Sequence, residues 1–176
     1  MNLLGWSATF VGLIPLACLA ALRVRGAHRG AAWWWMGAAF GVSFLADVAA
    51  KVVGPAFPSQ VYPVLQAGLF ALALLPRRAV SWVMVAVLAA ASTSIMARGA
   101  EGLDILLRVV AWGSVAGIGW FAKDAALRAS LLIAFGLGCL AWLAYVYAPG
   151  WWTWGFLQTC RAVGTGWFVV AVVRAK

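Results

Sequence analysis

"GVSFLADVAAKVVGP" (residues 41–55) is an apolar segment that would fit a membrane-spanning helix, except that it contains Asp47 and Lys51. The whole chain has only four acidic residues, so a carboxylate inside such a segment is unusual here. A charge at the centre of a bilayer costs roughly 2.5 to 3.5 kcal/mol on insertion scales, so it normally faces protein or water and has a partner. Asp47 is therefore the first candidate functional residue.

The composition around this segment is that of a membrane protein. Hydrophobic residues make up 66% of the chain and charged residues 10%, whereas soluble domains are closer to half apolar and a quarter charged. A membrane span needs about 20 mostly apolar residues. We therefore predict an all-α, polytopic membrane protein that forms a single domain over residues 1–176. Its seven transmembrane helices are expected at residues 3–22, 32–53, 58–75, 79–97, 104–122, 129–148 and 151–173.

The net charge of +9 follows the loops between the expected spans. Loops on one side of the expected bundle, together with the C-terminal tail, hold Arg23, Arg25, Arg29, Arg77, Arg78, Lys123, Arg128, Arg174 and Lys176. The opposite side has only Lys51, Arg98 and Arg108 near it. By the positive-inside rule, the N-terminus lies outside and the C-terminus in the cytosol. The charge thus predicts contact with the lipid bilayer and no nucleic-acid partner.

Two further features bear on the cellular setting. The first expected span has no basic segment before it, so we expect it to be retained rather than removed as a signal peptide. Asn and Lys are scarce beside abundant Ala, Arg and Gly, which favours a GC-rich bacterial genome and a location in the inner membrane.

Metal and cofactor chemistry finds little support in the sequence. Cys18, Cys139 and Cys160 lie within apolar spans without C-x-x-C spacing, and His28 is the only histidine. Cysteines in such segments behave as small buried hydrophobes. We expect no metal, no cofactor and no disulfide.

The 12 tryptophans divide into two groups. Most fall near the ends of expected spans, as in the aromatic belts of membrane proteins: Trp6, Trp33, Trp34, Trp35, Trp82, Trp120, Trp151, Trp152 and Trp154. Trp112, Trp142 and Trp167 are expected to lie deeper, where they serve either packing or ligand stacking. Gly113 and Gly117 form a G-x-x-x-G in the fifth expected span, and the sixth and seventh contain Gly136, Gly138, Gly164 and Gly166, all of which predict close helix packing.

The sequence also contains an internal similarity, at an offset of 95 residues in its first part and 92 in its second. "FGVSFLADVAAKVVGP" (40–55) aligns with "FGLGCLAWLAYVYAP" (135–149), and further on "VLQAG" (64–68) faces "FLQTC" (156–160). We interpret residues 1–76 and 103–176 as two copies of a three-helix unit, joined by a linker helix at 79–97. An odd linker makes the two units parallel, an arrangement found among transporters.

Polar residues of different spans are expected at a common depth. At about 1.5 Å per helical residue, Asp47, Tyr62, Gln66, Gln158 and Arg161 all fall in the outer half of the bilayer, while the inner half is nearly bare. Lys51 is one available partner for Asp47. Arg161, the one basic residue expected deep in a span, is the other, and we predict that Asp47 pairs with it.

Two interpretations of that ion pair remain open. It either locks the second expected helix against the seventh, or it lines a ligand or proton site. Asp104 and Arg108 are expected to form a further pair, structural in role, at the outer rim. Pro15 and Pro63 lie inside expected spans and predict bends that could act as hinges.

The chain resembles the SWEET, SemiSWEET and PQ-loop transporters. The likeness rests on the seven expected spans, the 3+1+3 pattern, "GLIPLA" in span 1, "YPVLQAG" in span 3 and "WLAY" in span 6. It implies a solute pocket between two triple-helix units. In this chain that pocket would be flanked by six residues, Asp47, Tyr62, Gln66, Trp142, Gln158 and Arg161.

A second resemblance implies a different function. "SFLAD" (43–47) is similar to the S-x-x-G-D stretch of bacterial lysoplasmalogenases, which are multi-span hydrolases of vinyl-ether lipids. General acid–base catalysis would need a second titratable group, and only arginine, lysine and tyrosine accompany Asp47. We therefore lean toward a protein without catalytic residues.

Three functions follow from the sequence. The first is a carrier for a small solute, and the second is a non-catalytic sensor or accessory subunit that binds a membrane partner or a second copy of itself. The third is a lipid hydrolase. A retinal protein is excluded, because the Schiff base needs a lysine that the last span lacks.

Overall fold

The computed structural model describes residues 9–52, 56–75 and 101–175, and all regular structure among them is helical. The elements are η1 (Val11–Leu13), α2 (Ile14–Val24), α3 (Ala31–Val52), α4 (Ala56–Leu74), α6 (Glu101–Trp120), α7 (Ala125–Leu131), η2 (Leu132–Leu137), α8 (Gly138–Tyr147) and α9 (Trp151–Arg174). The all-α prediction is confirmed. Each expected span within these residues coincides with a helix or a run of helices, and the expected linker helix at 79–97 lies outside them.

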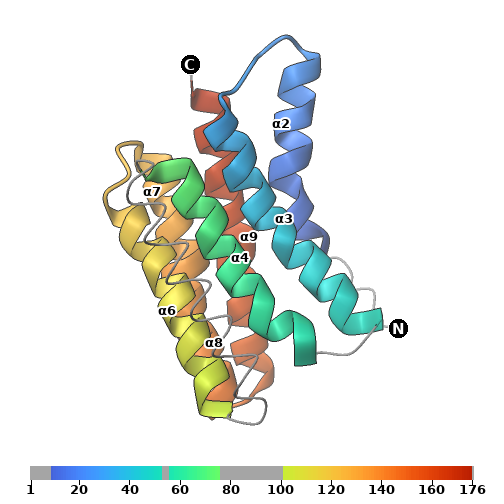
Figure 1. Cartoon of the computed structure of the whole chain (residues 1–176), viewed down its shortest axis with the longest axis vertical. Coiled ribbons are helices and arrows are strands. Elements are labelled where there is room, and N and C mark those ends of the chain that lie inside the picture. Colours follow the sequence, from blue (N-terminus) through green and yellow to red (C-terminus); the bar gives the residue numbers. More distant parts are fainter. Residues whose placement is uncertain (1–8, 53–55, 76–100, 176) are drawn as a thin grey trace.

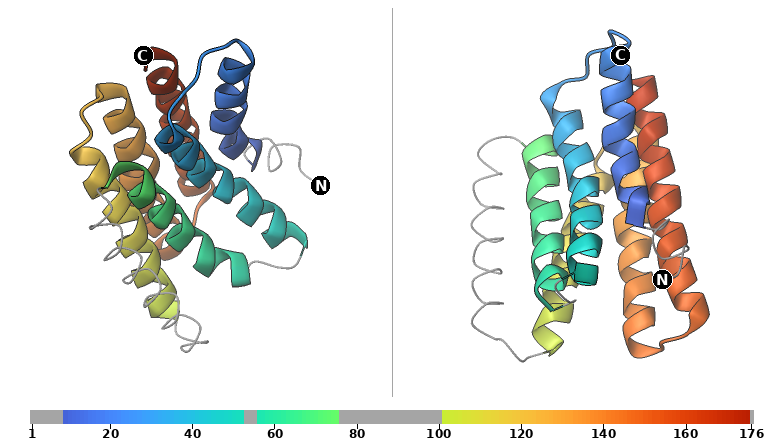
Figure 2. Two further views of the ribbon diagram at one scale, coloured as in Figure 1. Left: turned by 45° about the horizontal axis from the view of Figure 1, so that its top comes forward. Right: turned by 90° about the vertical axis from the view of Figure 1, so that its right-hand side faces the viewer.

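The described helices form an up-and-down bundle (Figure 1). Helices α2, α4, α6 and α9 run in one direction, and α3 and the α7–η2–α8 run go back in the other (Figures 1 and 2). Helix α3 packs against α2 and α4, α4 packs against α6, and α9 packs against α2, α7 and α8. Both chain segments on either side of the undescribed residues 76–100 therefore repeat the same sequence of directions.

One end of the bundle collects the connections that carry the basic residues. The α2–α3 connection, the α6–α7 connection and the C-terminus all lie at this end (Figure 1). The Arg29 side chain, from the α2–α3 connection, donates hydrogen bonds to the carbonyls of Val172 at 2.9 Å and Val173 at 3.3 Å. These carbonyls belong to the last turn of α9, where the helix has no further backbone N–H groups to donate to them. Arg29 therefore ties the first part of the chain to the end of the last helix.

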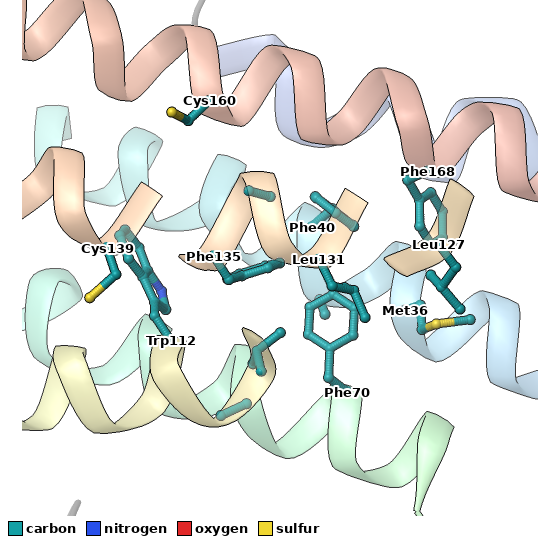
Figure 3. Packing of buried hydrophobic residues seen from close by; sticks show 14 of the residues in the cluster. Met36, Phe40, Phe70, Trp112, Leu127, Leu131, Phe135, Cys139, Cys160 and Phe168 are labelled. Carbon is teal, nitrogen blue, oxygen red and sulfur yellow. The ribbon is translucent and has the colours of Figure 1, made fainter. Parts of the chain in front are cut away.

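Four phenylalanines from four elements meet at the centre of the core (Figure 3). The ring centroids of Phe40 and Phe168 are 5.0 Å apart, as are those of Phe70 and Phe135, and Phe40 lies 5.7 Å from Phe135. Aromatic pairs in such tilted and edge-on arrangements contribute about 0.5 to 1.5 kcal/mol beyond simple burial. This cluster fixes the spacing of α3, α4, η2 and α9 below the polar residues.

Glycine allows one unusually close contact between backbones. A Cβ built on Gly164 in α9 would lie 2.5 Å from the Ala134 Cβ and 2.8 Å from the Ala134 nitrogen. The predicted close packing is thus confirmed at Gly164. Gly113 and Gly117 are exposed, and a Cβ on either would meet no described atom within 4 Å, so the G-x-x-x-G prediction is not met within this part of the chain.

Two irregular helical segments lie near the centre of the bundle. Residues Leu132–Leu137 form a π-helical segment between α7 and α8. The 3₁₀ turn η1 precedes Pro15, which occupies the first turn of α2. Proline fits the first turn because its missing N–H would be unpaired there in any case. Pro63 is buried inside α4, which continues past it from Ala56 to Leu74.

Two helical runs in the described residues have the length and apolar composition needed to cross a membrane, Ala125–Tyr147 and Trp151–Arg174. The exposed tryptophans lie near the two ends of the bundle. Trp151 is 91% exposed at the start of α9, and Trp120 is 64% exposed at the end of α6. Trp6 and Trp82 are outside the described residues.

Candidate functional site

The structure joins Asp47 and Arg161 in an ion pair. An Arg161 Nη2 donates to Asp47 Oδ2 at 3.1 Å, linking α3 to α9 across 114 residues of sequence. The Arg161 side chain is 18% exposed and that of Asp47 34% exposed. The contact predicted from sequence is confirmed, and Asp47 lies at the rim of the bundle interior rather than on an isolated face.

Arg161 also carries a neighbour on its own helix. Its Nη1 donates to Oε1 of Gln158, one turn earlier, at 3.3 Å. A guanidinium has five N–H donors in a fixed planar array. The hydrogen bonds to Asp47 and Gln158 use two of these donors. The ion pair engages only one carboxylate oxygen of Asp47, so it is not bidentate. Arg161 is therefore held in place while several of its donors stay uncommitted to described residues.

A small internal cavity lies beside this ion pair. Its volume is about 30 Å³, and α3, α4, α6, η1, η2 and α9 all contribute to its wall. The polar lining consists of Ser43, Tyr62, Gln66, Trp112, Arg161 and Thr165. Phe40 and Phe135 close it on the side of the aromatic core. Arg161 thus belongs both to the ion pair and to the cavity wall, whereas Asp47 touches only the ion pair.

Gln66 fixes one wall of the cavity. Its Nε2 donates to the carbonyl of Ala39 at 3.0 Å, and its Oε1 accepts from the indole Nε1 of Trp112 at 3.2 Å. The side chain is 3% exposed, and such a buried amide is costly unless its groups are bonded. The two bonds join α3, α4 and α6, so Gln66 sets the positions of three helices around the site.

Trp142 lies beside the cavity wall and faces a second arginine. The guanidinium carbon of Arg108 is 4.2 Å from the ring centroid of Trp142, 5.2 Å from Tyr62 and 5.7 Å from a ring of Trp112. A cation within about 6 Å of an aromatic face is attracted by the ring quadrupole. Arg108 is only 7% exposed.

The sequence led us to expect Arg108 at the outer rim, paired with Asp104, and the structure buries its guanidinium among three aromatic rings. The side chain of Asp104 is outside the described residues, so that pairing stays a prediction. The four-residue spacing of Arg108 and Trp112 on one helix face was the signal that could have indicated the aromatic contact.

All six residues predicted for the site thus belong to one connected region. Asp47, Arg161 and Gln158 form the ion-pair group, Tyr62 and Gln66 line the cavity, and Trp142 contacts Trp112 with ring centroids 6.4 Å apart. Trp167, the third tryptophan expected to lie deep in the bilayer, has a side chain that is 41% exposed on the surface of the bundle. The Lys51 side chain is outside the described residues. Sequence reasoning missed Ser43, Thr165 and Trp112 as lining residues.

The chemistry of this region is that of polar recognition. Within the described residues, no group of three or more His, Cys, Asp or Glu side chains is arranged to hold a metal ion. Cys139 and Cys160 are buried free thiols on different helices. The cavity offers a guanidinium, two hydroxyl groups, a phenol and an amide, all of which can donate hydrogen bonds.

Comparison with protein-family models, with curated proteins and with solved structures finds no match for this chain.

Proposed function

We propose that this protein is a seven-span carrier for a small solute, with its N-terminus outside, its C-terminus in the cytosol and its site in the outer half of the bacterial inner membrane. One observation carries the proposal: Arg161 pairs with Asp47 and, at the same time, lines an internal cavity. A pair that served only to lock two helices would have no need of a polar space beside it.

The membrane arrangement is supported by the direction of the helices and by the charges. The basic connections and the C-terminus share one end of the bundle, as the positive-inside rule requires of cytosolic segments. The ion pair lies between the middle of the bundle and the opposite end, because Asp47 comes late in α3 and Arg161 comes just before the middle of α9. Two helical runs are apolar and long enough for spans.

The carrier function is supported by the place of the cavity between the two proposed three-helix units. Helices η1, α3 and α4 supply one part of its wall, and α6, η2 and α9 supply the other. Phe40 and Phe135, which the internal similarity aligns, contact each other at 5.7 Å, as equivalent residues near a pseudo-symmetry axis would. Sites of repeat-built transporters lie at such repeat interfaces.

The volume of about 30 Å³ corresponds to a closed state of the site. A cavity of this size holds one or two water molecules. Alternating access would open it through relative motion of the two units, with the pair of Asp47 and Arg161 at the outer boundary. The pair is a single contact between partly exposed side chains, so in a water-filled site its opening would cost about 0 to 1 kcal/mol.

The test uses Asp47→Asn, Arg161→Gln and the double variant in purified protein and in proteoliposomes. A panel of small anionic, neutral and cationic metabolites is screened by thermal shift, and compounds that bind are then followed in uptake. We expect all three variants to fold. Arg161→Gln and the double variant should lose both binding and uptake, and Asp47→Asn should lose uptake. The matched controls are Asp124→Asn, which keeps an N-cap acceptor, and Arg128→Gln at the basic end.

Other outcomes would reject the carrier. Destabilised single variants with a rescued double variant would assign the pair a purely structural role, in a sensor or accessory subunit. Release of aldehyde from a lysoplasmalogen, lost on Asp47→Asn, would assign the protein to the hydrolases instead.

A further inference from the structure

We infer that the solute is a small monovalent anion that replaces Asp47 at Arg161, and that Asp47 takes up a proton as it is released. This inference rests on the proposed carrier function and names its substrate class and coupling ion. It follows from four features of the cavity: its charge, its hydrogen-bond donors, its size and the position of Asp47 outside it.

The charge of the cavity wall favours anions over cations. Arg161 is the only charged side chain among the described residues that line the cavity, and no lining residue is acidic. A cation entering this cavity would be repelled by the guanidinium of Arg161, because Asp47 lies on the other side of that guanidinium and outside the cavity wall. An anion would meet the guanidinium first. In a partly buried site at low effective dielectric, this difference in sign dominates ligand choice.

The uncharged lining residues supply donors for such an anion. Thr165 is 2% exposed, lines the cavity, and its hydroxyl makes no hydrogen bond with any residue that the structure describes. The Gln66 amide has two hydrogens, and the bond to the Ala39 carbonyl uses only one of them. Together with the remaining N–H groups of Arg161, these donors converge from α4 and α9. Hydrogen bonds to charged groups are roughly twice as strong as neutral ones.

The size of the cavity limits the anion to a few heavy atoms. About 30 Å³ is the space of one or two water molecules. Formate, with three heavy atoms, is therefore the size of ligand that suits this conformation. A ligand with an aromatic or sugar body would require the aromatic core to move.

The proton requirement follows from the charge of the pair. Asp47 and Arg161 are together neutral, so an anion added beside them leaves one unbalanced negative charge. Protonation of the released carboxylate restores neutrality: the carboxylate gains a proton from the outer solvent, and the anion takes its place on the guanidinium. Asp47 is 34% exposed and lies outside the cavity wall, so solvent can reach it while the anion occupies the inner side of Arg161.

Few other described groups could supply or absorb this charge. Helix α4 presents the phenol of Tyr62, and α6 presents Arg108, which lies among the rings of Tyr62, Trp112 and Trp142. The described residues of η1 at the cavity, Val11 and Gly12, carry no titratable group. Among these described residues, Asp47 is therefore the carboxylate to which the inference assigns the proton.

The first experiment measures binding and proton uptake with the full chain in detergent or nanodiscs. Formate is compared with formamide, which has nearly the same shape and no charge, and sodium gluconate, too large for the cavity, controls for ionic strength. Calorimetry in two buffers of different ionisation enthalpy gives the protons exchanged. We expect formate to bind and formamide not to bind, with about one proton taken up per formate, as neutrality requires.

The variants separate the roles of the two residues. Arg161→Gln should abolish formate binding, while Arg128→Gln should leave it unchanged. Asp47→Asn removes the competing carboxylate, so formate should bind about fivefold more tightly, the factor that corresponds to about 1 kcal/mol for a partly exposed pair, and without proton uptake. If Asp47→Asn does not fold, Asp47→Glu provides the test, because it must retain proton uptake.

The outcomes distinguish this inference from the carrier proposal. Arg161-dependent binding and uptake of a neutral or cationic solute would keep the carrier and overturn the anion inference. Formate binding with proton uptake, but without transport into proteoliposomes, would support the anion site and overturn the carrier. Formate binding without proton uptake, or weaker binding to Asp47→Asn, would overturn the exchange between Asp47 and the anion.

Discussion

The contact between Gly164 and Ala134 yields the sharpest stability prediction, because α9 approaches the π-helical segment there at backbone distance. In Gly164→Ala the new Cβ would lie 2.5 Å from the Ala134 Cβ, 2.8 Å from its nitrogen and 2.9 Å from its Cα. Two of these atoms are backbone and cannot rotate away. Helix α9 must therefore shift, and overpacking of this kind costs about 1 to 3 kcal/mol.

Gly166→Ala is the matched control, two residues further along the same helix. A Cβ there meets no described atom within 4 Å. Both substitutions gain the same helix propensity, about 0.5 to 1 kcal/mol relative to glycine. The difference between the two variants in free energy of unfolding thus isolates the steric cost, and we expect Gly164→Ala to be less stable by about 1 to 3 kcal/mol.

The assay is reversible unfolding in mixed micelles, followed by circular dichroism at fixed detergent composition. Adding Ala134→Gly to Gly164→Ala removes the 2.5 Å contact while the backbone contacts remain, so only part of the loss should return. If Gly164→Ala proves as stable as Gly166→Ala, the close approach of α9 to the π-helical segment is wrong.

Three further substitutions test contacts around the bundle. Arg29→Met removes two hydrogen bonds to the last turn of α9 and should lower the free energy of unfolding by about 1 kcal/mol. Hydrogen exchange at that turn should become faster. Arg25→Met is the control, and equal exchange in both variants would contradict the capping role of Arg29. Gln66→Leu leaves the Trp112 indole N–H without its acceptor, so the free energy of unfolding measured with denaturant should fall by about 2 kcal/mol. An unchanged unfolding midpoint would refute this role of Gln66. Arg108→Lys keeps the charge but loses the planar guanidinium, so the free energy of unfolding should fall by about 1 kcal/mol. The near-ultraviolet circular dichroism of the contacting rings should also change. An unaltered spectrum would argue against the stacked geometry.

The helices were predictable because their signal is carried by long apolar runs. The expected span 32–53 corresponds to α3 (Ala31–Val52), and 151–173 corresponds to α9 (Trp151–Arg174). Apolar length and flanking polar residues fix such boundaries within a few positions. The division of the expected span 129–148 into α7, η2 and α8 was not predictable, since a change from α to π hydrogen bonding alters no composition.

The ion pair was predictable for a different reason, namely that charged residues are scarce in the apolar segments. Few charges occur inside the apolar segments, and a charge in such a segment needs a partner, so Asp47 and Arg161 had almost no alternatives. The lining residues were not predictable in this way. Ser43 and Thr165 are common small polar residues, and only the packing of α3 against η1 and of α9 against η2 brings them to one cavity.

The cavity has one firmly held wall and one loosely held wall, and this difference bears on how the site would open. On the α3–α4–α6 side, both atoms of the Gln66 amide are bonded at 3.0 and 3.2 Å in a buried position. On the α9 side, Arg161 has one contact with Asp47 and one of 3.3 Å with its own helix. Buried, hydrogen-bonded groups are costly to separate, whereas ion pairs exposed to water exchange their partners at little cost.

Motion that opens the cavity between the two units should therefore separate α9 from α3 at the ion pair before it breaks the bond between Gln66 of α4 and Trp112 of α6. The contact of Gly164 with Ala134 couples α9 to η2, because backbones at this distance cannot slide independently. Helix α9 and the π-helical segment, both of the second unit, would then move together as one part against α3. An anion that replaces Asp47 on Arg161 removes the one described ion pair that bridges these two parts, so binding the solute and freeing α9 to move are the same event.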